Sequence, residues 1–367
     1  MSSISKNIVV TFGEIMGRMA TPSNLRFRQT REIQVTYAGA EASVAVSVQN
    51  FGGSARYVTA LPDHALAQAA VDSVRSMGVD TSNILRTKKG RLGMYYLETG
   101  ANQRASQVIY DRDHSAISIT TAEAYDWSSI FEGATWLHLS GITPSLSKIA
   151  YETTLTVAKM AYSKGIKVSI DLNFRKKLWS WDSSMDAKSL AKKCMAQILP
   201  HVTLIIGNEE DCADVLNIQP PNNDVHSGKL NTAAYNDVAK KVVSLYPQLE
   251  KVAITLRESH SATHNNWGAM LYDASCQVAH FAPLNSRGEY QPYEIKNIVD
   301  RVGGGDSFAG GLIYALTTKD LMQSEKALPF AVAASCLKHS IMGDFNLCTR
   351  AEVEALVDGN ASGRVQR

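Results

Sequence analysis

The stretch Ile298–Leu316 reads IVDRVGGGDSFAGGLIYAL, and the interpretation of the whole chain starts from it. Three consecutive glycines precede Asp306, and the apolar residues after it recur at helical spacing, so a helix begins at the glycines. The first N–H groups of a helix lack partners within it and face outward at the positive end of its dipole. Glycine also allows an anion to come close to the backbone. We therefore expect Gly303, Gly304 and Gly305 to form an anion hole, with Asp306 as a general base that accepts a hydroxyl proton.

A simpler interpretation of this stretch is a glycine-rich loop that leads into a helix, with Asp306 as a capping residue. Glycine loops alone are weak signals, so both interpretations remain open on these residues. Two better-known motifs are excluded here. No Gly-Lys-Ser/Thr follows the glycines as in a P-loop, and the stretch is not the G-x-G-x-x-G dinucleotide fingerprint.

Composition sets broad limits on the class of protein. The chain has 367 residues, of which 45% are hydrophobic, and its net charge is only +2. This charge balance gives no support for nucleic-acid or membrane-surface binding. Five cysteines without a C-x-x-C pair indicate neither a disulfide framework nor a zinc site. No apolar run approaches the roughly 20 residues of a membrane span. We expect a cytoplasmic protein with no nucleic-acid or membrane partner.

Short apolar runs that end in polar residues or glycine recur along the chain. They lie at 7–13, 136–141, 168–172, 205–207 and 252–256. Helical patterns follow such runs, as in the amphipathic segment from Ser147 to Lys164. Strand, polar tip and helix in repetition predict an α/β fold: a mainly parallel sheet with helices on both faces. Ligands of such sheets gather at the carboxyl ends of the strands.

Alternating segments at 93–98 and 107–112, joined by a polar turn, predict a β-hairpin. A third alternating segment lies at 27–35. Together they predict a small antiparallel lid over the main sheet, formed by about 16–37 and 90–115 within a single domain that spans 1–367. The segment 220–231, rich in Asn, Pro and Gly, predicts a surface insertion.

The run from Asp300 to Asp306, DRVGGGD, resembles the D-T-x-G-A-G-D motif of the ribokinase-like (PfkB) carbohydrate kinases, and it lies about four-fifths along the chain as it does there. Arg301 stands where Thr is usual. The segment YAGAEASVA at 37–45 resembles the family's G-G-A-E-x-N-V-A segment, whose glycine backbone meets the sugar. The resemblance implies a ribokinase-like fold, ATP-dependent phosphorylation of a sugar, contact of Gly39 with that sugar, and a homodimer formed through the lid. Without the family, Gly39 is a helix-start glycine.

The D-x-N-x-R run that contains Asn173 and Arg175 resembles family members acting on 2-keto-3-deoxygluconate. Arginine reads planar carboxylates through paired N–H donors. Tyr110 and Arg112 on the predicted hairpin resemble the second half of this substrate site, and Tyr95 lies opposite them. By residue type alone, Arg112 is an ordinary charged hairpin residue and Tyr95 a packing aromatic. The resemblance favours 2-keto-3-deoxygluconate; fructose or another ketose is the alternative substrate, and a non-catalytic sugar-binding regulator is the alternative function.

The run Asn208 to Asp211, NEED, resembles the N-x-x-E motif that organises Mg²⁺ near the phosphates. Asp211 is one methylene shorter than the usual Glu, so we expect it to hold Mg²⁺ through water. By residue type alone, an acidic first helical turn that complements the dipole explains these residues equally well.

The remaining ligand residues follow from the resemblance only. Thr255 and Arg257 match the nucleotide loop in position, with Arg257 where Gly is expected. His339 corresponds to the adenine region, although a satisfied helix-end histidine is the alternative. Asp300 corresponds to a monovalent-cation site. The implied cofactors are ATP, Mg²⁺ and, through Asp300, K⁺.

Overall fold

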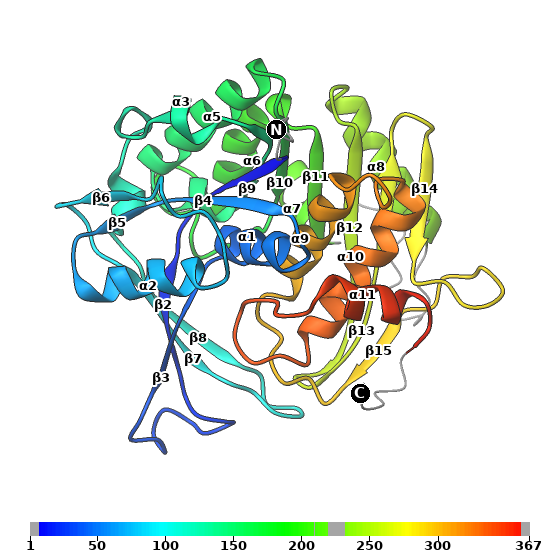
Figure 1. Ribbon diagram of the computed structural model, residues 1–367, viewed down its shortest axis with the longest axis horizontal. Coiled ribbons are helices and arrows are strands. Elements are labelled where there is room, and N and C mark those ends of the chain that lie inside the picture. The colour runs from blue at the N-terminus through cyan, green and yellow to red at the C-terminus, as the bar shows by residue number, and fades with distance from the viewer. Residues whose placement is uncertain (1–6, 209, 219–231, 361–367) are drawn as a thin grey trace, which may run out of the picture.

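A central β-sheet organises the computed structural model, which describes residues 7–208, 210–218 and 232–360. Its strand order is β14-β13-β12-β11-β10-β9-β1-β4, with β15 paired to β13 (Figure 1). Its strands are β1 (Ile8–Phe12), β4 (Ser54–Val58), β9 (Ala134–Ser140), β10 (Lys167–Asp171), β11 (Leu204–Asn208), β12 (Lys251–Ser261), β13 (His264–Asp273), β14 (Val278–Ala282) and β15 (Tyr293–Lys296). The insertion predicted at 220–231 lies outside the described residues.

The mainly parallel arrangement is confirmed. Every neighbouring pair from β4 across to β12 is parallel. The chain runs from β1 to β4 on one side and later to β9 on the other, so β1 marks the point where the winding reverses. In open α/β sheets, ligand sites lie at the carboxyl ends of the strands near such a point. The antiparallel strands β13, β14 and β15 extend this sheet, and the sequence did not predict them.

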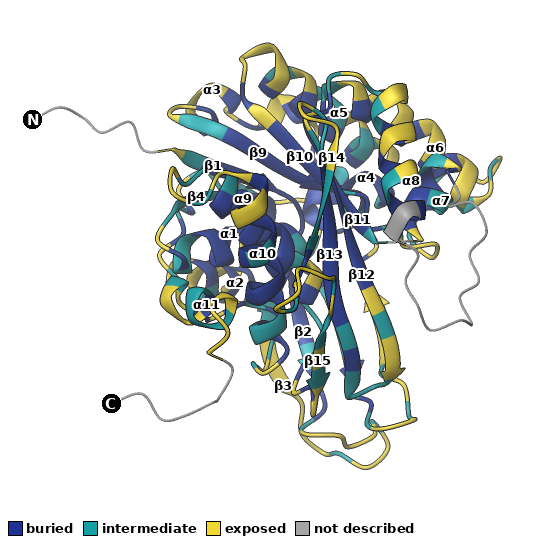
Figure 2. Cartoon of the chain, turned by 90° about the vertical axis from the view of Figure 1, so that its right-hand side faces the viewer, coloured by how far each residue is buried: buried dark blue, intermediate teal, exposed yellow. Residues whose placement is uncertain are grey.

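Helices cover both faces of the sheet, as predicted, and the central strands are buried between them (Figure 2). Successive side chains of a strand point to opposite faces of the sheet. In β1, Val9 therefore packs into one apolar cluster and Val10 into the cluster on the other face. The first cluster includes residues of α1, α2, α9, α10 and α11, and the second includes residues of α3, α5, α6 and α8. The helices are α1 (Ala40–Asn50), α2 (Ala65–Arg75), α3 (Trp127–Ile130), α4 (Ile142–Ser145), α5 (Lys148–Ser163), α6 (Ala187–Ile198), α7 (Asp211–Leu216), α8 (Thr232–Leu245), α9 (Gly304–Leu316), α10 (Ser324–Lys338) and α11 (Arg350–Val357). Within the described ranges, no helix combines the length and apolar character that crossing a bilayer requires.

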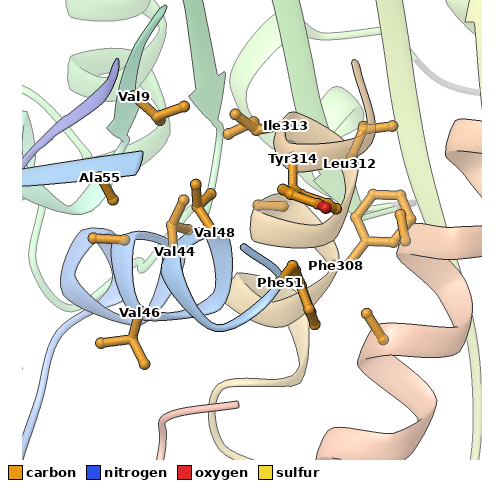
Figure 3. Packing of buried hydrophobic residues seen from close by; sticks show 14 of the residues in the cluster. Val9, Val44, Val46, Val48, Phe51, Ala55, Phe308, Leu312, Ile313 and Tyr314 are labelled. Carbon is orange, nitrogen blue, oxygen red and sulfur yellow. The ribbon is translucent and has the colours of Figure 1, made fainter. Parts of the chain in front are cut away.

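Helix α9 is anchored in the first cluster, and this anchoring positions the glycines at its start. Phe308, Leu312 and Ile313 are fully buried against α1 and α10 (Figure 3). The ring of Phe51, directly after α1, lies 5.5 Å from that of Tyr314 and 5.2 Å from that of Phe330 in α10. Burial of such side chains contributes roughly 1.5–3 kcal/mol each. The packing of α9 against α1 and α10 therefore fixes the position of the triple glycine at its start.

The small lid sheet is present and has the strand order β3-β2-β7-β8. Its strands are β2 (Met16–Ala20), β3 (Gln34–Ala38), β7 (Gly93–Glu98) and β8 (Gln107–Asp111). Two antiparallel pairs are joined by a parallel pairing of β2 with β7. The strand expected at 27–35 was misplaced: residues 21–33 form turns, closed by bonds such as Leu25 N–H to Pro22 O, and β3 starts only at Gln34.

Candidate active site

A cleft of about 500 Å³ lies where the lid, the carboxyl ends of β10 and β11, the middle of β12 and the start of α9 meet. Most of the residues expected from the sequence line it together. These are Gly39, Tyr95, Tyr110, Arg112, Asn173, Arg175, Asn208, Asp211, Thr255, Arg257, Gly303, Gly304, Gly305 and Asp306. His339 and Asp300 do not belong to this described lining. The expected residues thus line one cavity although Gly39 and Asp306 are 267 positions apart in the sequence.

The glycines form the N-terminus of α9 beside the cleft. Gly303 precedes the helix with φ of 82°, and a Cβ there would lie 2.1 Å from the carbonyl oxygen of Asp344, so only glycine fits. The helix closes its first bond from Ser307 N–H to Gly303 O, and no side chain in the described part of the chain caps the N–H groups before it. A Cβ on Gly305 would meet no atom within 4 Å. Unpaired N–H groups therefore border open space that an anion can enter.

Asp306 lies in the first turn of α9 and lines the cleft, where its side chain is partly exposed. Burial raises its pKa to about 7, and repulsion from Asp344 and Glu41 adds to this effect while Arg175 and Lys338 oppose it. A carboxylate with a pKa near the working pH is suited to accept a proton from a hydroxyl.

The tip of β10 brings Asn173 and Arg175 to the cleft. Asp171, the last residue of the strand, accepts a hydrogen bond from the N–H of Asn173 at 3.1 Å, and Asn173 adopts a positive φ of 36°. Burial and the nearby Asp211 and Asp306 raise the pKa of Asp171 well above its ordinary value. Arg175 is exposed, and no ion pair joins it to a carboxylate within the described part of the chain. Its guanidinium is available to an anionic ligand.

Arg112 reaches the cleft from the end of β8 but is already paired. Its Nε lies 2.8 Å from Glu14 Oε2, a second nitrogen bonds the same oxygen, and both side chains are buried. The guanidinium also lies 5.4 Å from the ring centre of Tyr110. The family resemblance predicts that Arg112 contacts the substrate, and it does not indicate the Glu14 partner. Because Glu14 balances this charge, Arg175 is the arginine of the two that remains without such a partner.

Tyr95 is buried in β7, and its hydroxyl donates to the carboxylate of Asp344 at 3.0 Å. Asp344 also accepts from Arg18, which pairs in turn with Asp300. These groups tie the lid to the loops at the start of α9. The sequence provides no local signal for this network, because Arg18 lies 282 and 326 positions away from its two partners.

Asp211 is buried at the start of α7, and its two oxygens accept from the N–H groups of Phe174 at 3.1 Å and Asn208 at 3.0 Å. The side-chain oxygen of Asn208 accepts in return from the N–H of Asp211. The carboxylate retains further lone pairs toward the cleft. No group of three His, Cys, Asp or Glu side chains is arranged to hold a metal directly among the described residues. This donor set fits Mg²⁺ held through water, since Mg²⁺ usually keeps several waters.

The end of the cleft beside β12 and β13 is positively charged. Arg257 and Arg301 both line it, and burial, with a smaller contribution from the charge of Arg257, lowers the pKa of Arg301. Trp267 lines the same end, and its buried Nε1 finds no acceptor within the described residues. Thr255 donates weakly to Gly207 O at 3.4 Å. Two like charges that line one end of a cavity favour an anionic ligand here.

His339 and Asp300 lie behind the glycine loop. The ring of His339 packs under Gly304 and 5.4 Å from the ring of Trp267, its Nδ1 lies 2.8 Å from Ser335 O, and burial lowers its pKa to about 4. The carboxylate of Asp300 is bonded by Arg18 and by the N–H groups of Val302 and Gly343.

Comparison with known proteins agrees with this architecture. A sequence model of the pfkB family carbohydrate kinases matches residues 6–346. The chain belongs to the pfkB family of carbohydrate kinases. Among relatives of this pfkB kinase, the 2-dehydro-3-deoxygalactonokinase of Haloferax volcanii is 30% identical and covers 97% of this chain and 98% of its own.

Solved structures support the same fold. The 2-dehydro-3-deoxygluconokinase of Thermotoga maritima is 44% identical, with a TM-score of 0.85 over 96% of this chain and 99% of the other. The fructokinase of Xylella fastidiosa, solved with bound ATP, has a TM-score of 0.73 over 97% and 100% of the two chains. At 20% identity this last likeness shows the fold alone. The ribokinase-like fold predicted from the sequence is thus confirmed, as is the carbohydrate kinase class.

Proposed function

We propose that this pfkB kinase transfers the γ-phosphoryl group of ATP to 2-keto-3-deoxygluconate, forming its 6-phosphate. The 44% identical structure of the Thermotoga enzyme supports this substrate. The observation that carries the proposal is one cleft that contains a raised-pKa carboxylate, an uncapped helix start and an arginine without a carboxylate partner in the described chain. These match, in order, a proton acceptor, a phosphoryl cradle and a reader of the sugar-acid carboxylate.

In the proposed mechanism, Asp306 accepts the proton of the primary hydroxyl as it attacks, and the N–H groups at Gly304 and Gly305 hold the phosphoryl oxygens. Arg175 and Asn173 orient the sugar acid, and Gly39 and Tyr110 border it. Mg²⁺, when bound with ATP, neutralises phosphate charge, and Asp211 would hold it through water.

The nucleotide lies, in this proposal, at the positively charged end of the cleft. Thr255 and Arg257 contact it there together with Arg301, whose guanidinium replaces the Thr usual in the family. Asn208 shapes the turn beside the phosphates. His339 acts from behind the glycine loop, where it supports Gly304 rather than contacting the base.

An ADP-release assay tests the proposal. The protein is given ATP, Mg²⁺ and one of 2-keto-3-deoxygluconate, 2-keto-3-deoxygalactonate, fructose or no sugar. We expect kcat/KM to be highest on a 2-keto-3-deoxy sugar acid. A higher value on fructose would make it a ketose kinase, and no ADP release on any sugar would favour a non-catalytic sugar-binding regulator.

Arg175→Leu tests recognition of the sugar-acid carboxylate separately from recognition of the rest of the sugar. Loss of a charged hydrogen bond costs about 1.5–3 kcal/mol, so KM for the sugar acid should rise by roughly ten- to a hundredfold. Lys177→Leu, at an exposed cation outside the cleft lining, is the matched control. Equal losses on fructose and on the sugar acid would speak against the carboxylate assignment.

We also propose a homodimer formed through the lid, in a protein that works in the cytoplasm. Every residue of β8 is exposed, and Val108, Ile109 and, on β3, Val35 leave apolar surface in solvent. Light scattering should show a dimer for the native chain and for Val278→Lys, which alters an exposed apolar residue on β14, but a monomer for Ile109→Lys. A monomeric native chain would overturn this assembly.

A further inference from the structure

The ammonium of Lys338 is a buried cation that the proposed mechanism does not use. Lys338 ends α10, its side chain is completely buried, and its Nζ donates to the main-chain oxygens of Ile341 at 3.2 Å and Asp300 at 3.4 Å. Lysine is almost never fully buried unless a specific partner compensates its charge. Here Asp300, Asp344 and Asp306 supply favourable electrostatic interactions, although burial lowers the Lys338 pKa overall.

The two carbonyls that Lys338 binds belong to the loops that hold the start of α9. One loop runs from Asp300 into the glycines, and the other leads from α10 to Asp344, whose carbonyl oxygen closely faces Gly303. The backbone also joins the two loops, since Val299 N–H donates to His339 O at 2.9 Å. A single positive charge bound by main-chain oxygens at this place stabilises the phosphoryl cradle from behind.

The surroundings of Asp300 do not fit the K⁺ that the family resemblance implied. Its carboxylate is bonded by Arg18 and by two backbone N–H groups, and its carbonyl oxygen accepts from Lys338. A further cation at this position would lie among two fixed positive charges and oxygens that already have partners. Coulomb repulsion disfavours it, and the donors already present occupy most of the lone pairs of these oxygens.

We propose that the Lys338 ammonium replaces a monovalent cation as a built-in positioning charge, so that this kinase needs no K⁺. An ammonium is a compact point charge with three donors, and it can be bound by carbonyl oxygens as an alkali cation is. The proposal rests on the kinase function described above. It predicts an enzyme that is insensitive to the identity of the monovalent cation, and a cation requirement that appears when the ammonium is removed.

The first test uses the native chain. ADP release is measured on the best sugar of the panel in chloride salts of K⁺, Na⁺, NH₄⁺ and tetramethylammonium at constant ionic strength. We expect kcat to agree within about twofold across the four salts. Activation by K⁺ of about fivefold or more over tetramethylammonium would overturn the proposal.

The second test removes the charge with Lys338→Met, and Lys326→Met, an exposed lysine of the same helix, is the control. In tetramethylammonium we expect Lys338→Met to lose roughly tenfold or more of kcat, and K⁺ or NH₄⁺ to restore much of it, whereas the control changes little. A loss that no small cation rescues would contradict the replacement role.

Thermal unfolding gives a readout that does not depend on the substrate. K⁺ should raise the Tm of Lys338→Met above its value in tetramethylammonium and leave the native Tm unchanged, even if no sugar of the panel supports ADP release. If the Tm values respond to K⁺ in this way but no sugar supports ADP release, the proposed function is refuted and this inference is retained. A rise in the Tm of the native chain with K⁺ would refute the inference itself. This native Tm can be measured even if Lys338→Met does not fold.

Discussion

Asp306→Asn should inactivate the enzyme and yet stabilise it. The folded protein raises the pKa of Asp306 from the ordinary 3.8 to about 7, mainly through burial. One pKa unit corresponds to about 1.36 kcal/mol, so ionised Asp306 costs the fold at most roughly 4 kcal/mol above pH 7. Because water in the cleft reaches the side chain, we expect about 1–3 kcal/mol. Asn keeps the shape and removes the charge.

The pH dependence gives the sign of this effect. A carboxyl whose folded pKa is raised favours the protonated fold, so its penalty is absent below about pH 4, grows as pH rises, and is complete above the folded pKa of about 7. The stabilisation by Asp306→Asn, measured by urea unfolding, should therefore be larger at pH 8 than at pH 5. The capping interpretation predicts the opposite sign: loss of a favourable charge near the helix N-terminus should cost about 0.3–1 kcal/mol. Destabilisation at pH 8, or an equal gain at both pH values, would refute the reasoning.

Three further predictions concern the cleft and the ion pairs beside it. The kcat/KM of the native enzyme should fall about tenfold per pH unit below pH 7, as Asp306 becomes protonated, and a flat profile down to pH 5 would contradict its role as base. Arg18→Met should lower the free energy of unfolding by about 3–5 kcal/mol in urea, because it leaves two buried carboxylates without their shared cation; a loss below 1 kcal/mol would show that they are not coupled to it. Gly305→Ala should fold normally, since its Cβ meets no atom within 4 Å, but its kcat should fall by at least about tenfold because the methyl group narrows the anion site. Gly303→Ala should be less stable, because its φ is positive and its Cβ would clash with the carbonyl oxygen of Asp344. A lower Tm for Gly305→Ala than for Gly303→Ala would contradict this geometry.

Local pattern was sufficient to predict much of the fold. The helix after the triple glycine, the hairpin at 93–112 and the polar strand tips each arise from the spacing of neighbouring residues, and each appears in the structure. The strand predicted at 27–35 was wrong over most of its length, because residues 21–33 form turns although their apolar residues alternate as in a strand. The pairing of β13 with β12 and β15 depends on contacts across the chain, so periodicity alone did not reveal the extension of the sheet.

Long-range ion pairs explain what the sequence could not provide at the site. The sequence does not indicate that Arg112, expected to contact the substrate, pairs with Glu14, which lies 98 residues earlier. Residue type and spacing do not indicate that Asp300, expected as a cation ligand, has Arg18 and Lys338 at its oxygens. Both pairings depend on tertiary contacts between distant segments, which residue type and spacing do not encode.

The most direct test of the central claim is the turnover of Asp306→Asn on the best sugar acid, by ADP release at pH 8, where urea unfolding verifies that the variant is folded. A positioned general base contributes typically 10²–10⁴-fold, so we predict a kcat lower than that of the native enzyme by about a hundredfold or more. A kcat within about tenfold of the native value would contradict the assignment of Asp306 as the base.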